Sequence, residues 1–161
     1  MLRTGRLLLR LPEEDDVAAL EHVLGDPEVM RFVGGGTPLD LPAIRAWVRG
    51  RAEPIEPGLV TYLVVAGTGE AIGYCGIERG EDTGLPELVY ALARPYWGNG
   101  YALEAARAVL ADRGTALPPL WATADPENGA SLRVLEELGF SARRVGRDVH
   151  GLATVFLQRP G

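Results

Sequence analysis

The pattern of apolar and polar residues changes its period several times along the chain. Residues 59–66 are rich in β-branched and aromatic side chains, which is typical of a strand. Residues 101–112 repeat apolar side chains every three or four positions, which is typical of a helix. The same criteria predict strands at residues 6–11, 59–66, 71–77, 87–93, 120–124, 140–147 and 152–158. They predict helices at residues 12–24, 42–50, 101–112 and 130–138.

The order of these elements indicates the fold class. It reads β, α, α, β, β, β, α, β, α, β, β, and short turns at residues 67–70 and 150–151 make two of the strand pairs hairpins. This order predicts an α/β fold of the α+β type, with a mixed, mostly antiparallel sheet flanked by helices. No repeat, low-complexity tract or linker interrupts the chain, so one domain is expected over residues 1–161.

Composition and charge exclude several functions. The chain has 22 acidic and 16 basic residues, a net charge of −6, which argues against a nucleic-acid partner because phosphate neutralisation needs a basic surface. One cysteine and two widely separated histidines predict no metal site. No apolar run is long enough for a bilayer, so no membrane partner and a cytoplasmic location are expected.

A glycine-containing motif, Y-W-G-N-G-Y-A at residues 96–102, lies between a predicted strand and a predicted helix. Gly98 and Gly100 let backbone N–H groups converge on an anion, and the following helix adds its positive N-terminal end. An ordinary tight turn is the alternative. A P-loop is excluded because the chain has no lysine, and Leu103 at the third glycine position disfavours a Rossmann site.

A second motif, N-G-A-S-L-R-V-L-E-E-L-G-F, covers residues 128–140. Leu132, Leu135 and Leu138 form its predicted buried stripe. Asn128 stands at the helix start and Ser131 in the first turn. Taken alone, they are explained by an N-cap and a solvated hydroxyl.

The two motifs together resemble the GNAT superfamily of acyl-CoA-dependent N-acetyltransferases, in particular the branch of the ribosomal-protein N-alpha-acetyltransferases. That branch has patterns similar to Y-W-G-x-G-Y-A-x-E-A, matched from Tyr96 to Ala105, and N-x-x-S-x-R-x-x-E-x-x-G-F, matched from Asn128 to Phe140. Residues 4–10 and the I-G-Y-C-G-I segment at 72–77 also resemble the family, so the likeness covers nearly the whole chain.

The resemblance implies a sheet that splays into a V between the strands at 87–93 and 120–124, with acetyl-CoA bound there as co-substrate and no metal. The pyrophosphate would be held by the backbone of Trp97, Gly98, Asn99, Gly100, Tyr101 and Ala102. Leu92 and Ala93 would pair with the pantetheine arm, and Asn128 and Ser131 would lie near the pantetheine and the sulfur. Relatives often have a basic residue where this chain has Asn99, so the motif lacks a cation near the phosphates.

The implied reaction is direct transfer of the acetyl group from acetyl-CoA to a primary amine in a ternary complex. A base must accept the amine proton. Glu87 is the candidate, with Glu78, Asp82 or a water chain as alternatives. Ser131 is the candidate donor to the leaving thiolate, directly, through water or by stabilisation alone. Many relatives place a tyrosine seven residues after the asparagine, where this chain has Leu135.

The acceptor is expected to be a protein N-terminus or a small-molecule amine. In the family it would lie among residues 30–37, Trp47, residues 74–78, Glu87 and His150, and an acidic rim there favours a cation. A protein of another class, a non-catalytic acyl-CoA-binding or regulatory module, would keep the glycine loop and lack a working base. The sequence leaves open whether the protein is a monomer or a homodimer.

Overall fold

The computed structural model describes residues 1–54, 56–113 and 118–161, and its strands form an eight-stranded sheet. The strands are β1 (Leu2–Arg3), β2 (Leu7–Arg10), β3 (Val60–Ala66), β4 (Ala71–Arg79), β5 (Pro86–Leu92), β6 (Leu120–Ala124), β7 (Ser141–Arg147) and β8 (Ala153–Arg159). Their spatial order is β1-β2-β3-β4-β5-β6-β8-β7, and each neighbouring pair is antiparallel except the parallel pair β5–β6. The predicted mixed, mostly antiparallel sheet is confirmed.

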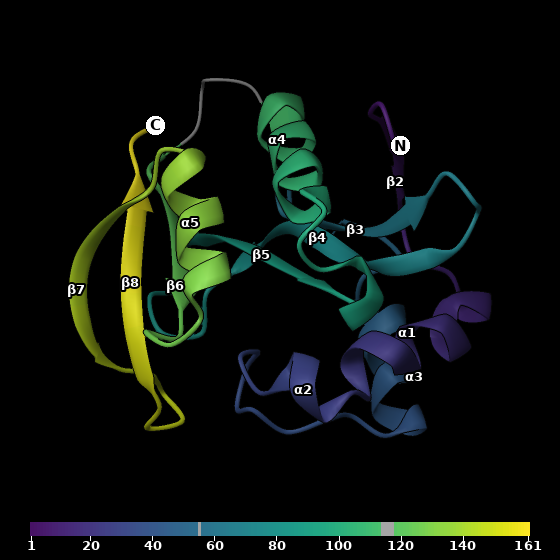
Figure 1. Cartoon of the computed structure of the whole chain (residues 1–161), viewed down its shortest axis with the longest axis horizontal. Helices are drawn as coiled ribbons and strands as arrows, with labels where there is room; N and C mark the ends of the chain where they lie inside the picture. Colours follow the sequence, from purple (N-terminus) through teal and green to yellow (C-terminus); the bar gives the residue numbers. More distant parts are fainter. Residues whose placement is uncertain (55, 114–117) are drawn as a thin grey trace.

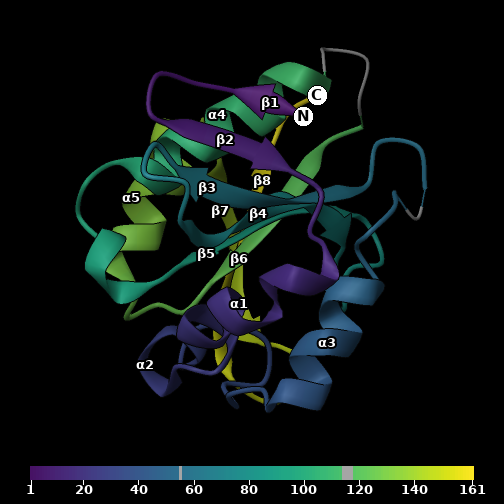
Figure 2. The same cartoon turned by 90° about the vertical axis from the view of Figure 1, so that its right-hand side faces the viewer.

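Helices cover both faces of this sheet (Figure 1). They are α1 (Val17–Leu24), α2 (Pro27–Met30), α3 (Leu41–Arg49), α4 (Tyr101–Arg113) and α5 (Gly129–Glu137), with 3-10 turns η1 (Glu14–Asp16) and η2 (Arg94–Tyr96). Helices α4 and α5 lie on one face and α1–α3 on the other (Figure 1), and β1 and β2 run beside α4 (Figure 2). Among the described residues no helix has the length and apolar character that a membrane crossing requires.

Because strand side chains alternate between faces, the sheet supports two hydrophobic cores. The α4–α5 core contains Leu88 and Leu92 from β5 together with Val109 of α4. The α1–α3 core contains Val89 and Ala91 from β5 together with buried residues of α1 and α3. Strand β5 therefore contributes side chains to both sides of the molecule.

The predicted boundaries differ from the structure mainly near the N-terminus. Strand β1 was not predicted because two residues are too few to show an alternation. The short helix α2 was also not predicted. Pro27 is its first residue, and Asp26 caps it by accepting from the backbone N–H of Glu28 at 2.9 Å. Proline is well tolerated at a first helical position because the N–H it lacks has no partner there.

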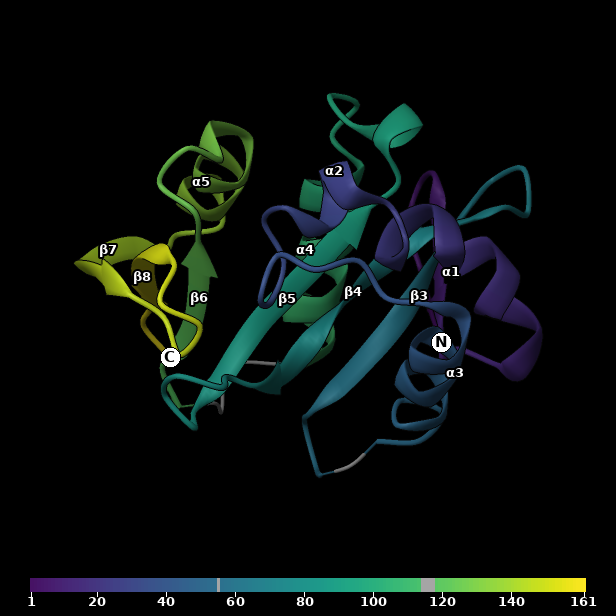
Figure 3. The same cartoon turned by 90° about the horizontal axis from the view of Figure 1, so that it is seen from below.

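The sheet opens between β5 and β6. Strand β5 is paired with β4 along its whole length and β6 with β8, but within the described chain β5 and β6 share the single register pair Glu87–Trp121. Figure 3 shows the two strands meeting at this end and diverging toward the other, as the predicted V requires. Each strand is held by its outer neighbour, so the sheet behaves as two halves joined at Glu87.

Candidate active site

Glu87 lies where the two halves of the sheet meet. It is 7% exposed, and Thr123 of β6 donates a hydrogen bond from Oγ1 to Glu87 Oε1 at 2.6 Å. Burial raises the pKa of Glu87, the Thr123 bond opposes this, and the negative charges of Asp82, Glu78 and Glu81 raise the pKa further. A buried carboxyl whose pKa lies above its usual range is a suitable proton acceptor near neutral pH.

Glu78 is the register partner of Glu87 on β4, but its environment is different. Arg51 donates to both Glu78 oxygens at 2.6 and 2.8 Å, and Thr61 donates to Oε1 at 2.5 Å. Burial alone would raise the pKa of Glu78, but the hydrogen bonds and positive charge of Arg51 hold it below its usual range. Glu78 is thus a weaker base than Glu87, with both oxygens already engaged.

Gly80 packs directly against the Glu87 carboxylate. A Cβ atom at Gly80 would lie 2.2 Å from Glu87 Oε2 and 3.0 Å from Thr83 Oγ1. The loop after β4 therefore fixes one oxygen of Glu87 by close backbone approach, which only glycine allows.

Gly80→Ala is expected to fold, because the atom that its methyl group displaces is the end of a flexible side chain. The displaced carboxylate should lower kcat about tenfold, since small misplacements of a catalytic group are costly. The KM for acetyl-CoA should stay within about twofold because Gly80 is far from the glycine loop. Steady-state kinetics and circular dichroism check this, and an unchanged kcat would contradict the role of Glu87 as base.

The glycine loop follows β5 and η2. Gly98 and Gly100 have φ of 73° and 77°, and the chain enters α4 with the Glu104 N–H donating to the Gly100 carbonyl at 3.0 Å. The Trp97 indole N–H donates to the Leu92 carbonyl at 2.7 Å and ties the loop to the end of β5. A Cβ at Gly98 would have nothing of the protein within 4 Å, so the space beside this backbone is open. The loop has the conformation that an anion cradle at a helix N-terminus needs.

The two residues at the end of β5 differ in where their backbone points. The Ala93 N–H donates to the Ile72 carbonyl at 2.8 Å and so continues the ladder with β4. Because N–H directions alternate along an antiparallel strand, the Leu92 N–H points toward β6. Leu92 rather than Ala93 offers a backbone donor to a chain lying in the V.

Arg6, which sequence reasoning missed, lies against the loop. Its Nη1 donates to the Asn99 carbonyl at 2.8 Å, its Nε donates to Glu104 Oε2 at 2.7 Å, and its guanidinium stacks 4.3 Å from the centre of the Tyr101 ring. A guanidinium paired with Glu104 is therefore held against the backbone of the loop by a residue 93 positions earlier in the sequence. Sequence spacing gives no sign of this contact.

Arg6→Ala is expected to raise the KM for acetyl-CoA about fivefold with little change in kcat. The variant loses a hydrogen bond and an ion pair that hold the loop, and exposed contacts of this kind contribute about 1 kcal/mol. Arg45→Ala, which removes an exposed ion pair with Glu14 on the other face, is the matched control. Equal KM values for the two variants would show that Arg6 does not shape the loop.

Ser131 lies in the first turn of α5. Asn128 caps this helix as predicted, since its Oδ1 accepts from the Ser131 N–H at 3.2 Å. Ser131 Oγ lies 2.8 Å from the hydroxyl of Tyr90, a residue of β5 that sequence reasoning also missed. Burial raises the pKa of Tyr90 to about 12. Strand alternation alone could have placed Tyr90 on the α5 side, but not at Ser131.

Glu87 and Tyr90 point to opposite faces of β5. Tyr90 packs against the α4–α5 core, whereas Glu87 shares its face with Val89 and Ala91 of the α1–α3 core. The V thus has a carboxylate on one side and a pair of hydroxyls on the other. Such a site can accept a proton on one face and donate a hydrogen bond on the other.

Three loops meet on the carboxylate side. His150 Nε2 lies 2.9 Å from Glu81 Oε2, and a Cβ at Gly35 would lie 3.4 Å from His150 Nδ1. The turn between β7 and β8, the loop after β4 and the loop after α2 are therefore in contact. The rings of Trp47 and Tyr74 pack in a tilted arrangement on the same face, with their centres 4.9 Å apart. Of the residues expected around the acceptor, the structure thus brings Gly35 close to His150 and Trp47 close to Tyr74.

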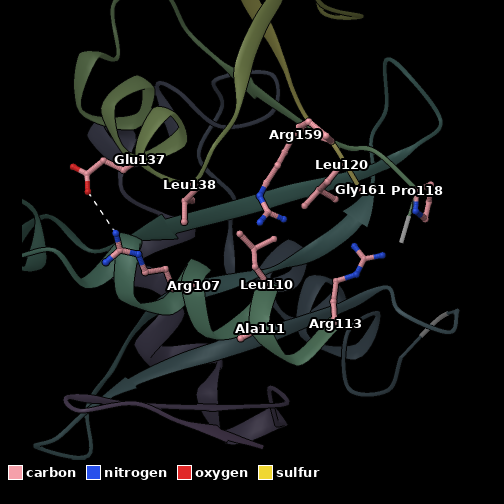
Figure 4. Close-up of a pocket in the computed structure, with 11 residues that line it drawn as sticks. Arg107, Leu110, Ala111, Arg113, Pro118, Leu120, Glu137, Leu138, Arg159 and Gly161 are labelled. Carbon is pink, nitrogen blue, oxygen red and sulfur yellow. Dashed lines mark ion pairs between the residues drawn. The ribbon is translucent and has the colours of Figure 1, made fainter. Parts of the chain in front are cut away.

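A cavity of about 550 Å³ lies elsewhere, between the C-terminal halves of α4 and α5 (Figure 4). Leu110, Arg113, Leu138 and Arg159 are among its lining residues. None of the predicted site residues lines it, so the candidate site remains at the splay. The described residues hold no group of three or more His, Cys, Asp or Glu side chains placed to bind a metal ion.

A splayed parallel strand pair, a glycine loop opening a helix and a buried carboxylate at the apex define an acyl-CoA-dependent acyltransferase fold. Residues 6–141 match the family model described as the acetyltransferase (GNAT) domain. The chain belongs to the GNAT family and is an acetyl-CoA-dependent N-acetyltransferase. The resemblance to the GNAT superfamily drawn from the two motifs is confirmed.

Relatives and solved structures agree with this assignment. The chain is 40% identical over 147 residues to the uncharacterized protein YkkB of Bacillus subtilis (strain 168), covering 86% of this chain and 83% of YkkB. The acetyltransferase of Agrobacterium tumefaciens str. C58 is 28% identical with a TM-score of 0.82, over 99% of this chain and 94% of that chain. RimL, a ribosomal L7/L12 alpha-N-protein acetyltransferase solved with coenzyme A, shares the fold: 19% identity, a TM-score of 0.79, and 98% and 95% of the chains covered.

Proposed function

We propose that this protein transfers the acetyl group of acetyl-CoA directly to a primary amine, with Glu87 as general base. The observation that carries the proposal is the position of Glu87. Its side chain is buried where β5 and β6 pair, at the single register pair that the described residues show, and its pKa is raised. An amine is mostly protonated at neutral pH, so a carboxylate of raised pKa on the acceptor face can remove the proton that blocks attack.

The co-substrate would be bound largely by backbone. The N–H groups of the loop from Trp97 to Ala102 and the start of α4 would hold the pyrophosphate, with Arg6 supporting the loop from behind. The Leu92 N–H would bind the pantetheine arm, and β5 N–H groups that face β6 are candidates to stabilise the oxyanion. Acetyl-CoA contributes an acetyl group activated as a thioester.

The acceptor is proposed to be a cationic amine, either a protein N-terminus or a small molecule. Glu78, Glu81 and Asp82 lie close enough to Glu87 to raise its pKa, and the same negative field attracts an ammonium group. The fold shared with RimL supports including N-terminal peptides among the candidate acceptors.

Direct attack is favoured over an acyl-enzyme intermediate by the state of the cysteine. Cys75 is fully buried in the α4–α5 core, and burial raises its pKa, so its thiol is a poor nucleophile.

The experiment that tests the proposal measures release of free CoA thiol from acetyl-CoA with a panel of N-terminal peptides and small amines. We expect turnover with at least one amine and intersecting double-reciprocal plots, as a ternary complex requires. Parallel plots would refute direct attack. Tight binding of acetyl-CoA with no thiol release across the panel would instead support the non-catalytic binding module.

A further inference from the structure

We infer, on the basis of the proposed function, that Tyr90 is a positioning residue that orients the Ser131 hydroxyl toward the thioester sulfur. Tyr90 is on β5 and Ser131 on α5, so their contact joins the two sides of the V on the face opposite Glu87. The pair lies 41 positions apart in the sequence, and only the fold brings it together.

Either hydroxyl can donate in this pair, and we assign Tyr90 as the donor. Its hydroxyl lies 2.8 Å from Ser131 Oγ and 3.4 Å from the Ser131 carbonyl, so two acceptors of one residue lie within its reach. A phenol is also a stronger donor than an alcohol because it is more acidic. When Tyr90 donates, Ser131 accepts through one lone pair, and its single O–H must point elsewhere.

The other contacts of Ser131 do not engage this O–H, so it can point into the opening between β5 and β6. Asn128 Oδ1 is bonded to the Ser131 N–H, not to Oγ, at 3.2 Å. Within the described residues, Ser131 Oγ has Tyr90 as its hydrogen-bond partner and no other. A Ser131 O–H held in this way by Tyr90 is a fixed donor beside the place where the thiolate forms. Preorganised donors are worth more than mobile ones because they need no reorientation during the reaction.

The proton balance is complete without transfer from Tyr90. The amine nitrogen forms the new C–N bond, the C–S bond breaks, and the sulfur leaves with the electron pair. Glu87 takes one proton from the ammonium form of the amine before attack, and a second proton leaves the nitrogen for solvent as the C–N bond forms. The thiolate is stabilised by the Ser131 hydrogen bond until solvent protonates it. Tyr90, with its pKa raised to about 12, keeps its proton throughout.

The first test needs no acceptor, so it stands even if acetyl transfer fails. Thiolate absorbance of bound CoA is titrated against pH, with the desulfo-CoA complex as the reference. Wild-type protein should lower the pKa of the bound thiol relative to free CoA. Tyr90→Phe should raise the pKa of the bound thiol again by about half a unit to one unit, because the variant removes the hydrogen bond that orients the Ser131 hydroxyl. The Kd for desulfo-CoA should be unchanged.

Tyr62→Phe is the matched control, because this tyrosine of β3 also bonds a helix side chain, Asp112 Oδ2, at 3.2 Å. It should leave the thiol titration at the wild-type position. A Tyr90→Phe titration identical to that of Tyr62→Phe overturns the inference.

The second test uses an amine that is turned over. Tyr90→Phe should lower kcat about threefold to tenfold and keep the KM for acetyl-CoA within about twofold. Because Tyr90 acts through Ser131, the double variant Tyr90→Phe/Ser131→Ala should be no slower than Ser131→Ala alone. The inference would be overturned if Tyr90→Phe lowered kcat by the same factor in wild type and in Ser131→Ala, or if it changed only KM. Absence of turnover with every amine would count against the proposed function, and the thiol titration would still decide the role of Tyr90.

Discussion

Glu87→Gln is expected to lower kcat by about 10²- to 10⁴-fold and to leave the KM for acetyl-CoA nearly unchanged. Glutamine has the same shape and can still accept the Thr123 hydrogen bond, but it cannot take a proton from the amine. Steady-state kinetics with a reactive amine check this. Glu21→Gln, at an exposed position on α1, is the control and should behave as wild type.

The pH dependence makes the test specific to Glu87. The base must be ionised to act, so wild-type kcat/KM should fall as the pH drops through a pKa above 4.5, the ordinary value for glutamate. This acidic limb should be missing in Glu87→Gln. If Glu87→Gln keeps the acidic limb and half of the wild-type activity, the base is not Glu87 but Asp82 or a water chain.

The stability of the same variant should change in the opposite direction. The folded state binds the Glu87 proton more tightly than the unfolded state does, because the folded pKa is raised. Ionisation of Glu87 therefore lowers the free energy of unfolding as pH rises through that pKa. Glutamine avoids this cost, so the Tm of Glu87→Gln at neutral pH should equal or exceed that of wild type. The difference should vanish below pH 4.5.

Most helices and strands were predictable from sequence because each is identified by the spacing of apolar residues within its own segment. Strand β5 and helix α4 were found within about a residue, and the glycine loop between them was recognised from its own residues. The short helix α2 was harder to predict, because a proline such as Pro27 can follow the end of one helix and also occupy the first position of the next. A short helix cannot be told from a turn when it has no room for a repeating pattern.

The site was only partly predictable, since several of its contacts are not local. Glu87 could have been an exposed residue at a strand end, and its burial comes from the pairing with β6 and from the backbone of Gly80. Arg6 and Tyr90 contact the loop and Ser131 across 93 and 41 positions. Spacing along one sequence carries no information about such distant pairs.

Gly100→Val is expected to weaken CoA binding by more than about 100-fold while the protein still folds. A β-branched residue is strained at φ +77°, by about 1–3 kcal/mol, and its Cβ would lie 3.5 Å from Arg6 Nη2. The loop must therefore move, and each amide-to-phosphate hydrogen bond lost is worth about 1.5–3 kcal/mol. Titration calorimetry with CoA and thermal unfolding check the two expectations.

Gly69→Val separates loss of the cradle from simple backbone strain. Gly69 has φ +87° in the turn between β3 and β4, with nothing within 4 Å of its Cβ, so the strain is similar and the site is untouched. Gly69→Val should show a comparable drop in Tm and bind CoA normally. Normal binding of CoA by Gly100→Val would disprove the cradle, whereas loss of CoA binding in both variants would indicate unfolding.

Loss of CoA binding in Gly100→Val alone would also explain how a chain of net charge −6 can hold a phosphate-rich ligand, because backbone amides add nothing to a charge count.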